Sequence, residues 1–372
     1  MSFASWSPRL PEIQERLDVS DAALGFTLVG MGVGGLAASL SSGWMVDRFG
    51  SRTMTACTSA GLCVCLPLMG IAPTAVLVFA SLIVLGALDG LTDVAMNAQA
   101  VELQRRVGSS LITRFHAAWS AGAVTGGVLA SRAADAGVSL RAQLIVTAVL
   151  LVVVTLASTM WLLPDHGAHI AVDVDAVAQP ARCWPPAILL KLFLVGLAVA
   201  LAESPPNEWA ALMMSDRFDL GPGAAGLGFV AVAVGMFVGR LVGDHATDRF
   251  GLERTRRGGA AFAAAGTVVA TVAPHPALAG AGLFVTGLGL SSLFPLLFRA
   301  ASDLTRGSHS GMAAFSSGAR LGFLVASPAV GLIAGGASIG VAVLVVAGGA
   351  ATVVAAGRLP RSAVSELAAD SL

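Results

Sequence analysis

"GWMVDRFGSR", residues 43–52, lies between two long apolar stretches of the chain. A weaker copy, "DHATDRFG", lies at residues 244–251, again between apolar stretches. The central aspartates of the two copies, Asp47 and Asp248, are 201 positions apart. A charged Asp-Arg-Phe-Gly sequence at the same place in two apolar segments indicates that the chain contains two related halves.

The composition indicates that the protein lies in a lipid bilayer. The 372 residues include only 22 basic and 22 acidic side chains, 56% are hydrophobic, and the mean hydropathy is +0.81. Such a chain is an integral membrane protein, and it has no basic face for nucleic acid. Four cysteines are too few and too irregularly spaced for a disulfide framework. These are Cys57, Cys63, Cys65 and Cys183.

Apolar runs long enough to cross a hydrocarbon core of about 30 Å as helices recur along the whole chain. Windows of about nineteen residues predict eleven full spans. They are residues 22–46, 53–71, 74–101, 113–134, 140–163, 187–214, 222–246, 257–273, 276–302, 309–335 and 338–357. Helices are expected because a helix satisfies its own backbone hydrogen bonds in lipid. Glycines at four-residue spacing in these runs favour close packing of helix backbones. The fold class is therefore all-α and polytopic.

Further matches support an internal repeat. "AALGF" at 22–26 matches "AGLGF" at 225–229, and Trp6 matches Trp209, both at an offset of 203. Asp47 and Asp248 are 201 positions apart, so the alignment of the two halves must shift by two residues between these matches and the aspartates. Two copied six-helix bundles related by an axis along the membrane normal are a known transporter architecture.

The domain boundaries follow from one long polar connection. We predict an N-terminal bundle at 1–163, a cytoplasmic linker at 164–186, a C-terminal bundle at 187–360 and a cytoplasmic tail at 361–372. The linker contains "DHGAHIAVDVD", which is interpreted as a solvated segment. A metal site is the alternative, but the spacing enforces no ligand geometry.

The first bundle has one helix fewer than the second. At the repeat offset, the partner of residues 187–203 falls before Met1, so "MSFASWSPRLPEIQ" is interpreted as the outer end of a truncated first helix. If the 44–52 loop is cytoplasmic, basic side chains favour that side by 15 to 5. This distribution agrees with the positive-inside rule. We expect a bacterial cytoplasmic-membrane protein that acts as a monomer.

Polar residues inside the predicted spans indicate a functional pathway. Asp89, Asp93 and Asn97 are spaced by four residues, so they form one stripe of a helix. "RFHAAWSAG" places His116 and Trp119 on one face of the next helix. An ionised side chain at the bilayer centre costs about 2.5–3.5 kcal/mol on insertion scales, so such residues need a partner or an aqueous cavity.

The segment "ESPPNEWA" carries a second group of polar residues around Pro205 and Pro206. The two prolines remove backbone donors and are expected to break the helix. Broken helices at a cavity are common in transporter sites. The segment holds Glu203, Asn207 and Glu208, followed by Trp209.

Three acids are candidates for proton coupling: Asp93, Asp89 and Glu203. A carboxylate in a low-dielectric cavity can bind and release a proton as the cavity alternates between wet and dry. The alternative is a permanent ion pair with Arg320 or His116 that only holds the bundles together.

The repeated loop resembles the G-x-L-x-D-R-x-G-R-[KR] sequence that the major facilitator superfamily carries between helices 2 and 3, with Ser51 at one of the usual basic positions. The matching residues are Gly43, Asp47, Arg48, Gly50 and Arg52 in the first copy, and Asp248, Arg249 and Gly251 in the second, where Asp244 replaces the first glycine. The resemblance implies a conformational gate that stabilises the outward-open state. A plain turn with positive-inside arginines is the alternative.

Within this superfamily the chain looks most like the YbjJ-like bacterial inner-membrane facilitators, through "SWSPRLPEIQ", "DVAMNAQAVE", "HAAWSAG" and "AESPPNEWA". "DVAMN" is more distantly similar to the E-x-x-x-N of the fourth helix in fucose-permease-like sugar:proton symporters, whose acid takes the proton. The acid expected in the first helix of that group falls near Ser7, so the resemblance does not imply fucose as the solute.

We therefore expect a secondary transporter that moves a small polar solute, sugar or sugar-like, by alternating access and proton symport. The expected solute-binding residues are Trp6, Arg9, Asn97, His116, Trp119, Asn207, Trp209 and Arg320. The alternatives are a proton-coupled exporter of metabolites or drugs and a non-transporting membrane sensor or scaffold. No nucleophile elbow, phosphate-binding loop or dinucleotide fingerprint occurs in a fitting context, so we expect neither an enzyme nor a cofactor.

Overall fold

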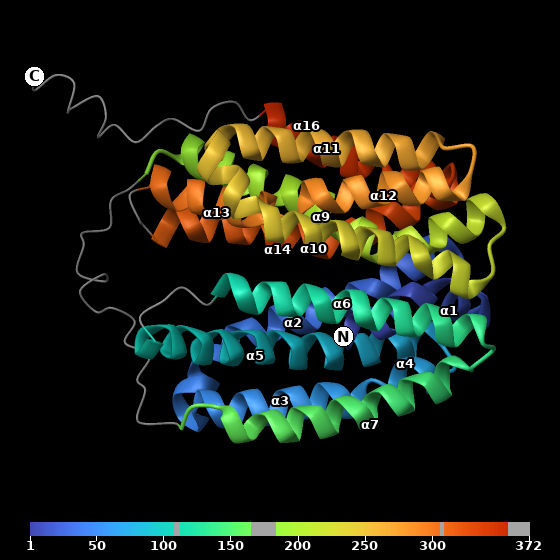
Figure 1. The fold of residues 1–372 in the computed structure, drawn as a ribbon, viewed down its shortest axis with the longest axis horizontal. Coiled ribbons are helices and arrows are strands. Elements are labelled where there is room, and N and C mark those ends of the chain that lie inside the picture. The colour runs from blue at the N-terminus through green and yellow to red at the C-terminus, as the bar shows by residue number, and fades with distance from the viewer. Residues whose placement is uncertain (108–111, 165–183, 306–308, 356–372) are drawn as a thin grey trace, which may run out of the picture. The chain divides into compact units, whose positions relative to one another are not determined.

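The computed structural model describes residues 1–107, 112–164, 184–305 and 309–355. Every regular element within these ranges is a helix (Figure 1). The N-terminal elements are η1 (Phe3–Ser5), η2 (Ser7–Arg9), α1 (Leu10–Leu17), α2 (Asp21–Phe49), α3 (Ser51–Cys65), α4 (Leu68–Ile71), α5 (Ala75–Val107), α6 (Ile112–Asp135), α7 (Leu140–Ser158) and η3 (Thr159–Trp161). The C-terminal elements are α9 (Pro186–Phe218), α10 (Pro222–Phe250), α11 (Leu252–Val272), α12 (Pro276–Leu290), α13 (Leu293–Leu304), α14 (His309–Gly336), α15 (Ile339–Val343) and α16 (Val345–Ala355).

The predicted spans coincide with these helices. Eight helical segments of the described chain are long and apolar enough to cross a membrane. The other three predicted spans, 113–134, 257–273 and 338–357, coincide with α6, α11 and the pair α15 and α16. The prediction of an all-α, polytopic membrane protein is therefore confirmed.

The chain forms two compact units. Unit 1 contains Met1–Pro180 and Asp219–Leu227, and unit 2 contains Ala181–Phe218 and Gly228–Leu372. The division after Pro180 falls inside the predicted linker, of which residues 165–183 lie outside the described part of the chain. The first turn of α10 groups with unit 1, which the sequence did not indicate.

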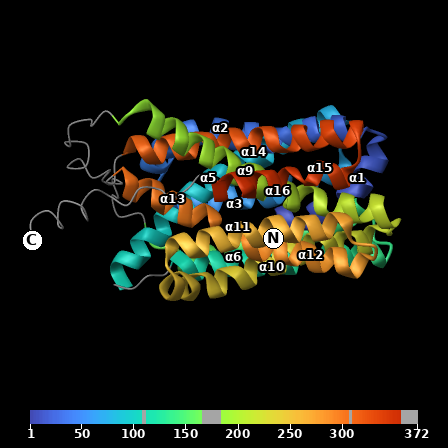
Figure 2. The same cartoon turned by 90° about the horizontal axis from the view of Figure 1, so that it is seen from above.

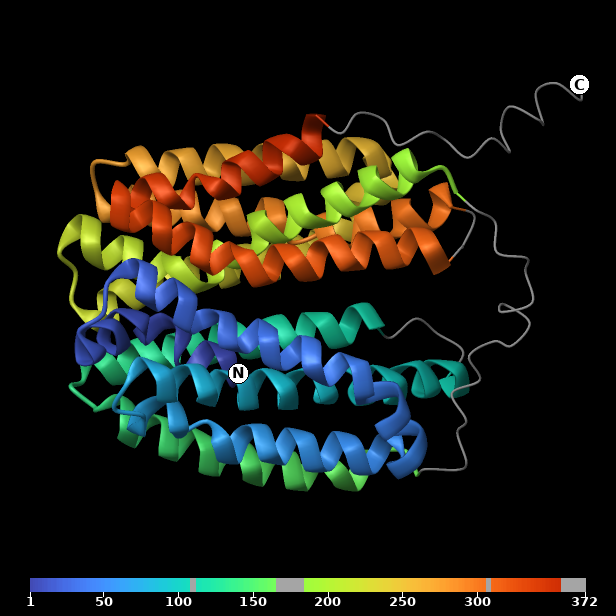
Figure 3. The same cartoon turned by 180° about the vertical axis from the view of Figure 1, so that it is seen from behind.

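Within each unit the helices pack in neighbouring pairs. In unit 1, α3 and α7 lie side by side (Figures 1 and 3). In unit 2, α11 and α12 do the same (Figure 2).

The α2–α5 pair of unit 1 is joined by direct backbone contact. A Cβ atom added at Gly34 would lie 2.0 Å from the carbonyl oxygen of Ile83. One added at Gly86 would lie 2.1 Å from the carbonyl oxygen of Met31. No side chain fits at either position, so glycine lets the two helices approach closely. The predicted packing role of the glycines is confirmed here.

Unit 2 repeats this contact between α10 and α12. A Cβ at Gly235 would lie 2.1 Å from the carbonyl oxygen of Phe284, and one at Gly287 would lie 2.2 Å from that of Val232. Each of these four residues is 201 positions after its counterpart in unit 1.

A second repeated feature is an arginine that binds the end of a neighbouring helix. Arg16 donates to the carbonyl oxygens of Met69 at 2.9 Å and Ala72 at 3.3 Å, beside the end of α4. Arg217 donates to Ala270 and Ala273 in the same way, at 3.1 and 2.7 Å beside the end of α11. A guanidinium satisfies helix carbonyls that lack partners in the helix itself.

These contacts correct the predicted register of the repeat. The equivalent pairs Arg16/Arg217, Gly34/Gly235 and Gly86/Gly287 are all 201 positions apart, and no two-residue slip occurs between them. The match of "AALGF" at 22–26 with "AGLGF" at 225–229, at an offset of 203, is therefore wrong, because it lies between two pairs that are 201 positions apart. Short matches of common apolar letters misled the alignment, whereas backbone contacts fix the register.

The two Asp-Arg-Phe-Gly sequences end in identical one-residue turns. Gly50 joins α2 to α3 with φ 83° and ψ 148°, and Gly251 joins α10 to α11 with φ 82° and ψ 154°. This backbone conformation is accessible essentially to glycine alone. The glycine of each copy is therefore required by the turn itself.

The predicted break at Pro205 and Pro206 does not occur. α9 runs as a helix from Pro186 to Phe218 through both prolines. Transmembrane helices tolerate proline because neighbouring groups satisfy the freed backbone atoms.

Replacing Gly34 with alanine should destabilise unit 1, because the new methyl group would collide with the backbone of α5. We expect the free energy of unfolding to fall by about 1–3 kcal/mol, as is typical of overpacking. Gly43→Ala on the same helix is the control, since a Cβ there meets no atom within 4 Å. Thermal unfolding in detergent measures both variants, and equal melting temperatures would contradict the packing role.

Candidate functional site

The acid stripe of α5 has the geometry that the sequence predicts. The Asn97 amide donates to the Oδ1 atom of Asp93 at 3.0 Å and to its carbonyl oxygen at 2.9 Å. Asp89, one turn earlier, and Asp93 are both exposed in unit 1, whereas Leu85 and Ala95 of the same helix are buried. The stripe therefore lies on the face of α5 that does not pack into the bundle.

The adjoining helix α6 carries the predicted aromatic residue. Trp119 is 55% exposed, and its neighbour Ser120 is buried. The side chain of His116 lies outside the described residues. Trp119 thus presents a large apolar surface with a polar nitrogen, which suits stacking against a ring-shaped solute.

In unit 2, Glu203 interacts with a residue that the sequence analysis did not assign. The cationic group that acts electrostatically on Glu203 is Arg240 of α10, and both side chains are half-buried. Arg320, the predicted partner on α14, is exposed. The sequence shows that Arg240 lies within a span, but only the fold shows which acid it faces.

Asn207 is placed by the helix that carries Glu203. Its amide nitrogen donates to the carbonyl oxygen of Glu203 at 2.8 Å. This bond satisfies a backbone carbonyl one turn earlier in α9 and fixes the side chain along the helix.

Trp209 and Glu208 form a network between α9 and α14. The indole nitrogen of Trp209 donates to the Oγ atom of Ser327 at 3.0 Å, and the Ser327 hydroxyl donates to Glu208. The Ser204 hydroxyl donates to the other carboxylate oxygen at 3.1 Å. Trp209 is 0% exposed. In this conformation the predicted solute ligand Trp209 is therefore part of the core of unit 2.

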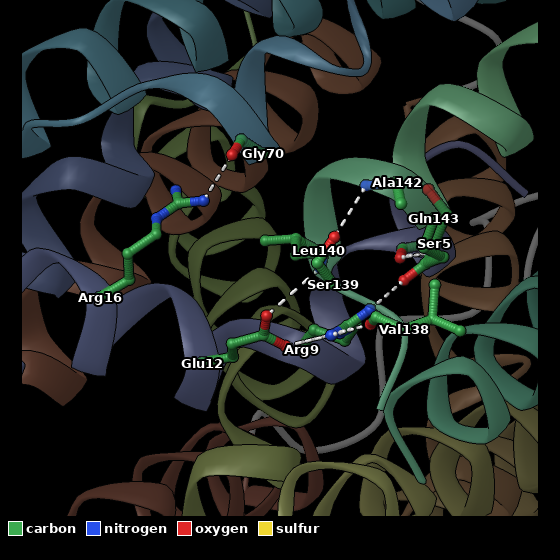
Figure 4. Close-up of polar contacts among 10 residues, drawn as sticks. All are labelled: Ser5, Arg9, Glu12, Arg16, Gly70, Val138, Ser139, Leu140, Ala142 and Gln143. Carbon is green, nitrogen blue, oxygen red and sulfur yellow. Dashed lines mark hydrogen bonds and ion pairs between the residues drawn. The ribbon is translucent and has the colours of Figure 1, made fainter. Parts of the chain in front are cut away.

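Trp6 and Arg9 are likewise buried, within unit 1, at 2% and 3% exposure. The Nη1 atom of Arg9 donates to Gln143 at 2.9 Å, and Nη2 donates to the Val138 carbonyl at 2.9 Å (Figure 4). Nε donates to Glu12 at 2.7 Å. Arg9 therefore joins η2 and α1 to the beginning of α7, and these contacts give it a structural role.

The candidate gate residues lie at the ends of α2, α3, α10 and α11. Asp47 and Arg48 are exposed, and the Arg52 guanidinium donates to the Thr159 carbonyl at 3.3 Å. In the second copy the charged residues are all exposed; they are Asp244, Asp248 and Arg249. No carboxylate of the loops is buried in its own unit, so both loops offer charge at the surface.

Gln99 is a structural residue of this end of unit 1 that the sequence analysis missed. Its amide donates to the Ser51 hydroxyl at 2.7 Å and to the Leu163 carbonyl at 3.2 Å. Its carbonyl oxygen accepts from the Leu163 amide at 2.9 Å. Gln99 thus fixes the beginning of α3 and the segment after η3 on α5. Its position two residues after Asn97 in a span was the available signal.

No group of three His, Cys, Asp or Glu side chains within the described ranges is placed to hold a metal ion. The "DHGAHIAVDVD" segment of the linker lies outside those ranges.

Membrane-length helices in a duplicated arrangement, with carboxylates inside the spans, define the class of protein as a polytopic carrier. The family model of the Major Facilitator Superfamily matches residues 1–204. The chain belongs to this superfamily. It is a multi-pass membrane protein, and in bacteria such proteins lie in the cytoplasmic membrane.

Known proteins agree with this assignment. An uncharacterized MFS-type transporter of Yersinia pestis is 29% identical over 359 residues, which are 96% of this chain and 92% of the relative. The nucleoside transporter NupG has a TM-score of 0.74 at 14% identity, with 96% of both chains covered. A D-xylose-proton symporter has 0.73 at 15% identity, with 96% and 94% covered. The E. coli fucose:proton symporter FucP has 0.59 at 14%, with 96% of both covered. At these identities the solved structures show the fold.

Replacing Arg9 with methionine should destabilise the protein in the absence of any solute. The change leaves Glu12, Gln143 and the Val138 carbonyl without their donor, which should cost about 3 kcal/mol or more. The control is Arg132→Met, because Arg132 is 76% exposed and lies 3.9 Å from Asp135. That exposed pair should contribute less than about 1 kcal/mol.

Thermal unfolding without solute separates the two roles of Arg9. A variant that melts like the wild type and loses only solute binding would contradict the structural role.

Proposed function

We propose that this superfamily transporter is a proton-coupled symporter of a small polyhydroxylated solute, of the sugar or nucleoside type. The observation that carries the proposal is the stripe of Asp89, Asp93 and Asn97. It lies inside an apolar span, on the face of α5 that does not pack into the bundle. The names of the structural neighbours, a nucleoside transporter and two sugar–proton symporters, support this solute class.

Asp93 is proposed as the principal proton carrier. An ionised carboxylate within a span is costly unless water or a cation reaches it. Its Oδ1 atom accepts the Asn97 amide, which holds the carboxyl in one orientation. Asp89 lies one turn away, and two carboxylates at this spacing resist simultaneous ionisation. The stripe therefore favours carrying one proton and releasing it when water enters.

Glu203 and Arg240 are proposed as a charge pair that responds to the transport cycle. A half-buried acid facing an arginine is stable while both are charged. Protonation of Glu203 would remove its attraction to Arg240 and so change the stability of the contact between α9 and α10. This gives the second bundle a proton-dependent element of its own.

In unit 1 the residues proposed to contact the solute are Asn97, His116 and Trp119, and in unit 2 they are Asn207 and Arg320. Aromatic faces and amide or guanidinium donors are groups that typically bind a sugar ring and its hydroxyl groups. Trp6, Arg9 and Trp209 are buried, so any contact they make with solute requires another conformation. The gate remains the pair of charged loops with Gly50 and Gly251 at their turns.

Asp93→Asn should abolish accumulation of solute against its gradient while leaving exchange of labelled for unlabelled solute intact. The amide keeps the shape and hydrogen bonds of the carboxylate but cannot carry the proton. Glu102→Gln on the same helix is the control, since Glu102 is partly exposed and pairs with Arg106 at 2.8 Å. Uptake into proteoliposomes with an imposed pH gradient measures both, and accumulation by Asp93→Asn would reject the assignment.

The solute should be found by a thermal-shift screen of sugars, nucleosides and carboxylic acids on purified protein. A ligand at about 100 times its dissociation constant adds about 2.7 kcal/mol to the folded state. A compound that stabilises the protein but does not cross proteoliposomes would instead indicate a sensor. Movement of the compound out of acidified vesicles against its gradient would indicate an exporter.

A further inference from the structure

Glu208 is a carboxyl group in a span that the proposed function does not use. It lies near the middle of α9, in the apolar segment Pro186–Phe218. Its two oxygens accept hydrogen bonds from the hydroxyls of Ser204 and Ser327. Within the described part of the chain, no arginine, lysine or histidine lies within ion-pair distance of it. Its partners are therefore neutral groups.

The seam that holds Glu208 leaves little room for rearrangement. α9 and α14 touch through their backbones: a Cβ at Gly196 would lie 2.1 Å from the Phe315 carbonyl oxygen, and one at Gly318 would lie 1.9 Å from that of Phe193. On the other side, the fully buried Trp209 donates to Ser327. These backbone contacts lie away from Glu208 along both helices. Beside the carboxyl, Glu208 is half-buried and its neighbours Ser204, Trp209 and Ser327 are buried, which restricts the water that can reach it.

The charged groups of the surrounding helices lie elsewhere. The other titratable residues of α9 are Lys191, Glu203, Asp216 and Arg217, and Glu203 faces Arg240. α12, α15 and α16, which also pack on α9, contain no titratable side chain. Arg320 of α14 and Arg299 of α13 are exposed, and the side chains of His309 and Asp303 lie outside the described residues.

The two charge states of the Glu208 carboxyl differ in how well this environment stabilises them. An ionised carboxylate that is half-buried among buried neighbours in an apolar span loses hydration, which two neutral hydroxyls offset only in part. A neutral carboxylic acid in the same place loses little and still exchanges hydrogen bonds with both serines. The uncharged form is thus the one that this environment stabilises.

We propose that Glu208 is a proton-binding site of unit 2, occupied in this conformation, and distinct from Asp93 and from the Glu203–Arg240 pair. The bound proton keeps the α9–α14 seam free of charge. Release of the proton requires water or a cation to reach Glu208, and so requires this seam to loosen around Ser327 and Trp209.

Infrared spectroscopy of the full-length protein in lipid nanodiscs tests the site without any solute. At neutral pH the wild type should show protonated-carboxyl C=O absorption, and the component that belongs to Glu208 should be lost in Glu208→Gln. The matched control Glu102→Gln, which removes a carboxylate that pairs with Arg106, should retain the band. A Glu208→Gln spectrum identical to that of the wild type would show that Glu208 is ionised and would overturn the proposal.

A second variant guards against loss of fold. Ser327→Ala keeps the acid and removes one hydrogen-bond partner, so the band should persist at a shifted frequency. A band unchanged in frequency would show that the acid does not contact Ser327 and would contradict the site. The outcome is independent of the proposed symport, because loss of the band in Glu208→Gln is compatible with either result of the Asp93→Asn transport assay.

Discussion

Backbone contact between paired helices determines where every other group of this protein can lie. In unit 1 the contact is between α2 and α5, in unit 2 between α10 and α12, and a third joins α9 to α14. Lipid offers no hydrophobic driving force for helix association, so close van der Waals packing at glycine has to stabilise the helix pairs. Once these faces are closed by bare backbone, polar side chains are restricted to the remaining faces of the same helices. The acid stripe of α5 illustrates this, since Gly86 faces α2 while Asp89 and Asp93 are exposed.

Three carboxyl groups within the spans lie in three different environments. Asp93 accepts an amide on an exposed helix face, Glu203 faces a cation, and the contacts of Glu208 within the described part of the chain are serine hydroxyls. The environments differ in how much water or counter-charge they provide, so the three acids differ in the condition under which each is ionised. Arg9 is a fourth case in which charge is retained by full hydrogen bonding rather than by water. Its pairing with Glu12 belongs to the structure of unit 1.

Much of the fold follows from sequence, because hydropathy and glycine spacing act locally. The span positions, the stripe of α5 and the turn glycines Gly50 and Gly251 all depend on residues close in the chain. The predictions that were wrong concern contacts between residues far apart in the chain. Burial of Trp209 is set by Ser327, 118 residues away, and the prolines of α9 do not break it. Likewise, the partner of Glu203 could not be read from spacing, because many arginines lie in or near the spans.

The internal repeat separates scaffold from chemistry. At the structural offset of 201, the glycine contacts, the helix-end arginines Arg16 and Arg217 and the one-residue turns occur in both halves. The acids do not: Asp93 corresponds to Phe294 and Glu208 to Ser7. Each bundle needs its own structural contacts, so these features occur in both halves. Residues that bind a proton or a solute are needed at a single site, so they occur in one half only. The unrepeated polar residues are therefore where the function of this transporter is best sought.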